Sequence, residues 1–176
     1  MAEDICGGVA SLNHIVTNIL QFARVDKPEM DRIAPCYAIE DAIISALHLI
    51  ERSGIELRKD LLLSSAVMGN RELLKQAFLN IILNSLQAME AGGSLHISME
   101  NSANGKVKII FKDTGGGMAP AVKDSAFEPF YSTRERGSGL GLAIVHNIID
   151  AHGGKVEIES ERDNGTELAV FLPGAD

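Results

Sequence analysis

Three glycines alternate along one short stretch of the chain, and an apolar helix is expected directly after them. The stretch RERGSGLGLAIVHNIIDAHGG runs from Arg134 to Gly154 and contains Gly137, Gly139 and Gly141. Backbone N–H groups left uncovered at the start of a helix bind phosphate oxygens well, because the helix dipole is positive there. The stretch therefore predicts either a phosphate cradle or a plain turn before a core helix, and the glycines alone leave both open.

Two common nucleotide-binding fingerprints do not fit this stretch. The dinucleotide-binding motif needs a glycine at its sixth position after a strand, whereas that position is Leu142 and a polar segment precedes it. The P-loop needs Gly-Lys-Ser or Gly-Lys-Thr, which the chain does not contain. A phosphate cradle here would therefore belong to a different nucleotide-binding fold.

Two asparagines lie one helical turn apart in the segment NRELLKQAFLNIILNSLQAME. Asn80 and Asn84 share a partly apolar stripe of a helix that we expect from a cap at Asn70 to about Met89. An unpaired buried amide costs about 1–3 kcal/mol, so both side chains need partners. Those partners are either a neighbouring loop or a hydrated Mg²⁺ with phosphate oxygens, since Mg²⁺ favours oxygen ligands and keeps several waters.

An aspartate closes an apolar strand in the segment IIFKDTGGGM, and glycines follow it directly. The Asp113 carboxylate can accept a hydrogen bond from an exocyclic amine, while Gly115 and Gly117 let a ring approach the backbone. An ordinary aspartate turn after a strand accounts for the same residues equally well.

A mobile segment with apolar anchors is expected in FEPFYSTRERGSG. Phe127, Phe130 and Tyr131 supply the anchors, and Thr133 and Arg134 offer polar contacts. The segment predicts either a lid that closes over a ligand or an ordinary packed loop.

The composition predicts a globular protein without a nucleic-acid role. The 176 residues are 45% hydrophobic and 23% charged, and the net charge of −8 opposes binding to a phosphate backbone. No apolar run approaches the ~20 residues of a membrane span, and MAEDICGGVA lacks the features of a signal peptide. Cys6 and Cys36 lie in no metal-ligand spacing, so we expect reduced thiols and a cytoplasmic location.

The elements that position these residues follow from hydrophobic periodicity. Apolar residues from Ile5 to Ala23 form a heptad seam, which predicts a helix that packs on its own domain or pairs in a helical hairpin or dimer. VDKPEMDRIAP predicts a linker over 28–37. From 38 to 176 we expect one domain, with helices at 38–51, 70–89 and 140–151 and strands at 55–61, 65–68, 95–100, 106–112, 155–161 and 167–172.

This element order predicts an α+β fold. Helices should cover one face of a mixed, mainly antiparallel sheet, which gives a two-layer α/β sandwich. The N-terminal helix would precede the sandwich, and residues 114–138 would be glycine-rich and irregular.

The ordered motifs resemble the ATP-binding domain of two-component sensor histidine kinases, which has the Bergerat fold of the GHKL superfamily. The resemblance covers about residues 38–172, and the segment LNSLQAM is most similar to the sensor kinases of the nitrogen-regulator type. The matching elements are Asn80 and Asn84 for the N box, Asp113, Gly115 and Gly117 for the G1 box, Phe127 to Phe130 for the F box, Gly137 to Leu142 for the G2 box, and Gly165 and Thr166 for the final Gly-Thr pair.

The resemblance implies that the domain binds ATP with Mg²⁺ under a lid. By this analogy Asp113 binds the adenine amino group, Asn84 ligates Mg²⁺, and Asn80 lies near the phosphates; the two asparagines are the expected catalytic residues. Gln87 stands where many relatives have a lysine, and Arg134 of the lid is expected to supply that charge instead. The residues expected to contact the nucleotide are Asn80, Asn84, Gln87, Asp113, Gly115, Gly117, Met118, Thr133, Arg134, Gly137, Ser138, Gly139, Leu140, Gly141, Leu142 and Thr166.

The resemblance also implies a protein-histidine kinase that transfers the γ-phosphate of ATP to a histidine for relay to a response-regulator aspartate. Related ATPases have a glutamate base where this chain has Asn80, which disfavours simple hydrolysis. A non-catalytic nucleotide-binding or adaptor module and a hydrolytic ATPase of the same fold are the alternatives.

Residues 1–27 resemble the second helix of the dimerisation and phosphotransfer hairpin in these kinases. The first helix, which carries the acceptor histidine, is not found in this sequence, and His14 lacks the adjacent acid and the proline of an acceptor box. The expected partners are therefore a response-regulator receiver domain and the hairpin helices of a homodimeric, bacterial full-length protein that can be membrane-anchored.

Overall fold

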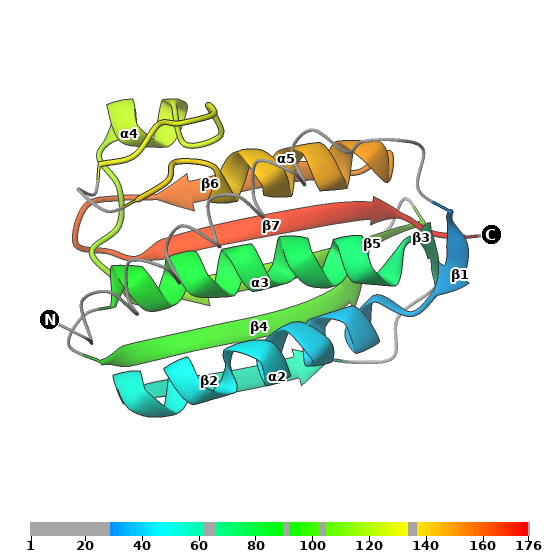
Figure 1. Ribbon diagram of the computed structural model, residues 1–176, viewed down its shortest axis with the longest axis horizontal. Helices are drawn as coiled ribbons and strands as arrows, with labels where there is room; N and C mark the ends of the chain where they lie inside the picture. Colours follow the sequence, from blue (N-terminus) through cyan, green and yellow to red (C-terminus); the bar gives the residue numbers. More distant parts are fainter. Residues whose placement is uncertain (1–28, 62–65, 90–91, 103–104, 134–136, 176) are drawn as a thin grey trace, which may run out of the picture.

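The computed structural model describes residues 29–61, 66–89, 92–102, 105–133 and 137–175. These residues form two layers, a five-stranded sheet and a set of helices that cover one of its faces (Figure 1). The expected helix over Ile5–Ala23 lies outside the described residues, so the division of the chain at residue 27 stays a prediction. Within the described ranges, no helix is both long and apolar enough to cross a bilayer.

The central helix α3 (Arg71–Ala88) has the bounds that its sequence predicts. Its N-cap is Asn70, whose side-chain oxygen accepts a hydrogen bond from the Leu73 N–H at 3.1 Å. Leu74, Phe78 and Ile82 recur at four-residue spacing and are fully buried. The apolar face of α3 is thus turned toward the sheet.

Two further helices flank α3 on the same face of the sheet. The helix α2 (Pro35–Ser53) starts with a proline in its first turn and buries a stripe that includes Ile39 and Ile43. The helix α5 (Gly141–Ala151) buries Ile144, Val145 and Ile148. Both pack against α3, so this central helix has neighbours on both sides (Figure 1).

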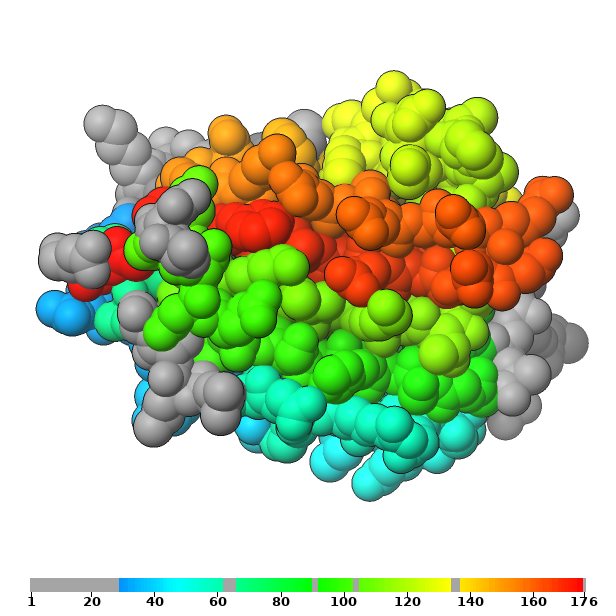
Figure 2. All heavy atoms as spheres, turned by 180° about the vertical axis from the view of Figure 1, so that it is seen from behind, coloured from blue at the N-terminus to red at the C-terminus, as the bar shows by residue number. Residues whose placement is uncertain are grey.

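The five-stranded sheet has the order β2-β4-β5-β7-β6, with β2 parallel to β4 and the other pairs antiparallel. Its strands are β2 (Ile55–Leu61), β4 (Gly93–Asn101), β5 (Lys106–Asp113), β6 (Lys155–Ser160) and β7 (Thr166–Pro173). The expected two-layer α+β architecture, with helices on one face, is confirmed. Figure 2, seen from behind, shows that the strands themselves form the surface of the opposite face.

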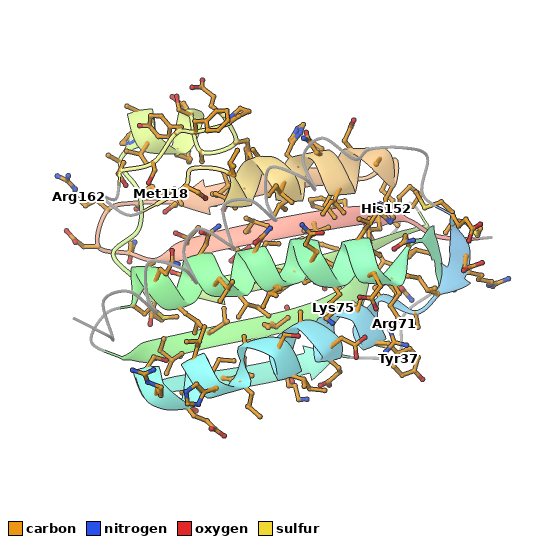
Figure 3. The ribbon with its side chains drawn as sticks, viewed as in Figure 1. Tyr37, Arg71, Lys75, Met118, His152 and Arg162 are labelled. Carbon is orange, nitrogen blue, oxygen red and sulfur yellow. The ribbon has the colours of Figure 1, made fainter. Side chains whose placement is uncertain are left out.

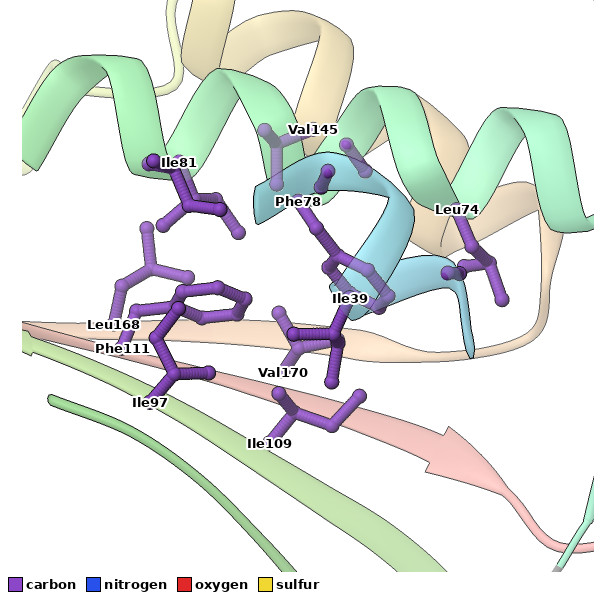
Figure 4. Close-up of a cluster of buried hydrophobic side chains, with 14 of the residues drawn as sticks. Ile39, Leu74, Phe78, Ile81, Ile97, Ile109, Phe111, Val145, Leu168 and Val170 are labelled. Atoms are coloured by element: carbon purple, nitrogen blue, oxygen red, sulfur yellow. The ribbon is translucent and has the colours of Figure 1, made fainter. Parts of the chain in front are cut away.

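The core lies between the three long helices and the covered face of the sheet. Alternate strand residues such as Ile97, Ile109 and Val170 point toward the helices and are fully buried (Figure 4). The rings of Phe78 and Phe111 join the two layers, with centroids 5.7 Å apart. Every element that carries a candidate functional residue is therefore anchored in one core.

Three elements differ from the sequence-based expectation. The short strand β1 (Asp31–Ile33) pairs antiparallel with β3 (Val67–Gly69), and α2 starts at Pro35, so the segment 28–37 contains a strand and a helix start rather than only a linker. The helix α4 (Pro120–Asp124) lies inside the segment that was expected to be irregular. Both short elements depend on contacts that local periodicity does not record.

A buried histidine joins the C-terminal end of α5 to the start of α3. The ring of His152 accepts a hydrogen bond at Nε2 from the Asn70 N–H (3.0 Å) and donates from Nδ1 to the Ile148 carbonyl (2.6 Å). Because an N–H only donates and a carbonyl only accepts, this arrangement requires the neutral ring. Burial lowers the pKa of His152 below its ordinary value.

This histidine predicts a loss of stability on acidification. Because the pKa of His152 is lower in the folded state than in the unfolded chain, the unfolded chain binds the proton more tightly. The contribution of His152 to stability is therefore complete above about pH 6.5, the ordinary histidine pKa, and is lost as the pH falls through the pKa of the folded state. Denaturant unfolding between pH 7.5 and 5 should show a smaller acid loss in His152→Gln than in the wild type. The exposed His146→Gln is the control, and equal acid losses in all three proteins would contradict this account.

Candidate functional site

A cavity of about 580 Å³ lies between α3, the start of α5, the loop after β5 and the β6–β7 hairpin. A volume of this size is typical of small-molecule and cofactor sites. Most of the residues that the sequence singled out line it: Asn80, Asn84, Gln87, Asp113, Gly117, Met118, Thr133, Gly137, Ser138, Gly139, Gly141, Leu142 and Thr166.

Three of the expected residues do not line the described cavity. Leu140, the N-cap residue of α5, is only 1% exposed and belongs to the hydrophobic core. Gly115 lies behind the wall, where an added Cβ would come within 2.7 Å of the Ala88 carbonyl oxygen. Arg134 lies outside the described residues. The Leu140 side chain thus lies in the core, and its expected contact with the nucleotide stays a prediction.

A buried carboxylate organises one wall of the cavity. Asp113 is the last residue of β5 and is 5% exposed. Its Oδ1 accepts hydrogen bonds from the backbone N–H groups of Gly115 (3.0 Å) and Thr166 (3.1 Å), the latter directly across the β5–β7 pairing. These two bonds hold the carboxylate in place and join the glycine loop to the last strand.

The glycine loop after Asp113 packs closely against the β6–β7 hairpin. Gly116 accepts a hydrogen bond at its carbonyl from the Asp163 N–H at 2.8 Å. Gly117 has a left-handed φ of 61°, and an added Cβ would overlap the Glu161 carbonyl group. Glycine is therefore required at 117 by both the backbone conformation and the close approach.

The two asparagines of α3 line the same cavity as the glycine run. Asn80 is 7% exposed, and its Nδ2 is a buried donor without a hydrogen-bond partner among the described residues. The Asn84 amide lies against the start of α5, with its Nδ2 3.4 Å from the position of a Cβ added to Gly141. The asparagine pair and the glycine run, which are far apart in the sequence, therefore meet at this cavity.

The glycine run itself is shaped by the segment that precedes it. Gly139 has a left-handed φ of 66° and accepts a hydrogen bond at its carbonyl from the Phe130 N–H at 2.9 Å. A side chain at 139 would overlap the backbone of Phe130 and Tyr131. Phe127 meets His146 of α5 with ring centroids 5.8 Å apart, which anchors the other end of the expected lid.

The hairpin between β6 and β7 adds residues that the sequence analysis did not single out. Arg162 lines the cavity, and Figure 3 shows it at the same end of the molecule as Met118. Ser160 accepts a hydrogen bond at its Oγ from the Met118 N–H at 2.9 Å. The segment RDNGT carries only a turn signal in sequence, so nothing local pointed to these contacts.

A matched pair of glycine variants tests the geometry of this loop. Gly117→Ala should lower the free energy of unfolding by about 1–3 kcal/mol, because alanine must adopt the left-handed conformation against the Glu161 carbonyl group. Gly116→Ala is the control, since an added Cβ there meets no atom within 4 Å, and it should stay within about 0.5 kcal/mol. Denaturant unfolding measures both; equal losses would contradict the described packing.

Comparison with known proteins shows which family the chain that forms this cavity belongs to. The family described as "Histidine kinase-, DNA gyrase B-, and HSP90-like ATPase" matches residues 69–176. The signal transduction histidine-protein kinase AtoS of Escherichia coli (strain K12) is 29% identical over 170 residues, which are 94% of this chain and 27% of AtoS. Sporulation kinase C of Bacillus subtilis (strain 168) is 43% identical over 107 residues, which are 61% of this chain and 25% of that kinase.

Solved structures give the same result. Full-length ShkA in complex with AMPPNP is 28% identical, with a TM-score of 0.82, and the match covers 93% of this chain and 36% of ShkA. The catalytic domain of histidine kinase ThkA is 26% identical, with a TM-score of 0.74 over 84% of this chain and 97% of that domain. This chain spans about a quarter to a third of the length of the curated relatives that it matches.

The matched segment 69–176 contains α3, the Asp113 wall, the glycine run and the final hairpin, which are the parts that enclose the cavity. The family match, the named relatives and the similar solved structures therefore all point to the same domain that the cavity residues define. The chain belongs to the histidine kinase-, DNA gyrase B- and HSP90-like ATPase family, and it contains the ATP-binding catalytic domain of a sensor histidine kinase.

Proposed function

We propose that this chain binds ATP in the described cavity and passes the γ-phosphate to a histidine on a helical hairpin. The observation that carries the proposal is the convergence of three features in one cavity. These are the Asp113 carboxylate, the Asn80 Nδ2, which has no hydrogen-bond partner among the described residues, and Asn84 against the start of α5. Relatives that share this domain are named as a signal transduction histidine-protein kinase and a sensor histidine kinase, which supports the same activity.

Asp113 and its neighbours would recognise the adenine ring. In the described part of the chain, both hydrogen bonds of this carboxylate go to Oδ1, which leaves Oδ2 to accept from the exocyclic amine. Gly117 has no side chain to block a planar ring, and Met118 supplies an apolar surface beside it. The neighbour ShkA, whose structure holds AMPPNP, supports a nucleotide here.

The phosphates would lie between the asparagines and the glycine run. The buried Nδ2 of Asn80 is a donor that needs an acceptor, and a phosphate oxygen fits this requirement. Gly137, Gly139 and Gly141 line the cavity directly before and at the start of α5, where the helix dipole attracts an anion.

The same end of the cavity fits a hydrated Mg²⁺. No group of three or more His, Cys, Asp or Glu side chains gathers to hold a metal in the part of the chain that the structure describes. Mg²⁺ commonly keeps its waters and takes the rest of its ligands from phosphates and one or two protein oxygens, for which the amide oxygen of Asn84 is suited. When bound, the ion would neutralise charge on the phosphates.

The transfer itself would need little acid–base chemistry from this domain. A nitrogen lone pair of the acceptor imidazole forms a bond to the γ-phosphorus, the bond from that phosphorus to the bridging oxygen breaks, ADP leaves, and one proton passes to solvent. By the resemblance to related ATPases, Asn80 stands where those proteins have a glutamate base, and an amide is a poor base, so this site would not activate water. Catalysis would then rest on positioning and charge stabilisation.

The partners follow from the same proposal. Histidine kinase ThkA, solved in complex with response regulator protein TrrA, is 25% identical, with a TM-score of 0.80 over 97% of this chain and 49% of ThkA. We infer that a receiver domain takes the phosphate from the acceptor histidine. Residues 1–27 would contribute the second hairpin helix of a homodimer in the bacterial cytoplasm.

Reconstitution in trans tests the proposed activity. The full chain is incubated with γ-labelled ATP and a separately made hairpin that carries the acceptor histidine, and phosphohistidine on the hairpin is measured. Asn84→Ala should lower the rate by about a hundredfold, since it removes an interaction with the reacting phosphates. Asn147→Ala on α5, outside the cavity lining, is the matched control and should keep the wild-type rate.

Two other outcomes would point to the alternative functions. ATP binding without any phosphohistidine would indicate a nucleotide-binding adaptor module. Steady phosphate release that Asn80→Ala abolishes would indicate a hydrolytic ATPase. Stable label on His14 would contradict an acceptor outside this chain.

A further inference from the structure

The hydroxyl of Ser160, at the end of β6, makes three polar contacts beside the cavity. The Met118 N–H lies 2.9 Å from its Oγ, the Gly165 carbonyl oxygen lies 2.9 Å away, and Thr166 Oγ1 lies 3.0 Å away. A serine hydroxyl has one proton to donate and two lone pairs that accept, so three partners satisfy its full hydrogen-bonding capacity.

The chemistry of the partners fixes the direction of each bond. The Met118 N–H only donates, so Ser160 accepts there, and the Gly165 carbonyl only accepts, so the Ser160 proton goes to it. No proton remains on Ser160 for the third contact. The Thr166 hydroxyl must therefore donate to Ser160, which is directly opposite it in the β6–β7 pairing.

This direction decides what Thr166 offers to a ligand. Its hydroxyl proton is held by Ser160, so Thr166 lines the cavity with lone pairs alone. The adjacent Asp113 carboxylate also only accepts.

The backbone donors nearby are occupied as well. The N–H groups of Gly115 and Thr166 bond to Asp113, that of Gly116 bonds to the Ala88 carbonyl (3.2 Å), and that of Met118 bonds to Ser160. The Asp113 and Thr166 side chains therefore present hydrogen-bond acceptors to a ring, and these four backbone N–H groups are already bonded within the protein.

We propose that Ser160 is a positioning residue that orients the Thr166 hydroxyl and thereby makes the cavity select a 6-amino purine over a 6-keto purine. The inference rests on the proposed function, in which a purine binds against Asp113. At position 6, an exocyclic amine meets acceptors at this wall, whereas a keto oxygen would meet the same lone pairs and stay unpaired; the N1 proton of a 6-keto purine does not relieve this mismatch at the oxygen. A site built to bond one group rejects the other strongly for this reason.

The test compares ATP with inosine triphosphate, which has a keto oxygen in place of the 6-amino group and a proton on N1, where ATP has none. Equilibrium titration of the full chain gives the ratio of the two dissociation constants. Ser160→Ala frees the Thr166 hydroxyl to donate toward the cavity, so the preference for ATP should fall about tenfold, which is the effect of one reoriented hydrogen bond. Ser160→Thr keeps a hydroxyl and should keep the wild-type ratio.

A second pair of variants separates this role from a merely structural one. Thr166→Val removes the hydroxyl, so it should weaken ATP more than inosine triphosphate, because the 6-keto oxygen cannot use the acceptor that the 6-amino group uses. In the Thr166→Val background, Ser160→Ala should no longer change the ratio. Thr166→Val alone gives a result even if Ser160→Ala does not fold.

Several outcomes would overturn the inference. An unchanged ratio in Ser160→Ala, with ATP still bound, would overturn it and leave the proposed function intact. The inference would also be overturned if Ser160→Ala lowered the ratio by the same factor with and without the Thr166 hydroxyl. Equal losses of affinity for both nucleotides in Thr166→Val would overturn it as well. A wild-type chain that binds neither nucleotide would overturn both this inference and the proposed function.

Discussion

The burial of α3 between α2, α5 and the sheet is the interaction on which the rest of the structure depends. Its apolar residues Leu74, Phe78 and Ile82 are fully buried and hold the two layers together. The same helix carries Asn80 and Asn84 on the side that faces the cavity. Because all five side chains share one rigid helix, the packing that stabilises the fold also sets the position of the two amides.

A second constraint joins the glycine loop, the last strand and the final hairpin. The Asp113 carboxylate bonds to the backbone of Gly115 and Thr166, and Ser160 bonds to Met118 and to Thr166. Each recorded bond pairs a donor with an acceptor, so this partly buried polar network is satisfied and stabilises the wall. The wall that would meet the purine is therefore fixed by the protein before any ligand binds.

The sequence predicts the long elements and the members of the site much better than the short elements and the connections between them. The helix α3 was found because its cap and its buried spacing are local features, and the cavity residues were found through ordered motifs. The strand β1 exists through its pairing with β3, more than thirty residues away, and local periodicity cannot record that contact. Leu140 has glycines on both sides, which suggested a phosphate contact, yet its apolar side chain is buried in the core. Ser160 gave no signal because its role arises only from the three groups that fold around it.

The affinity of the full chain for ATP, measured by equilibrium titration for the wild type and for Asp113→Asn, tests the central claim most directly. Asparagine keeps an oxygen for the Gly115 and Thr166 N–H groups but puts a donor where the adenine amine needs an acceptor. The account predicts that ATP binding weakens about a hundredfold or more, while the free energy of unfolding changes by less than about 1 kcal/mol. Wild-type ATP affinity in a folded Asp113→Asn chain would contradict it.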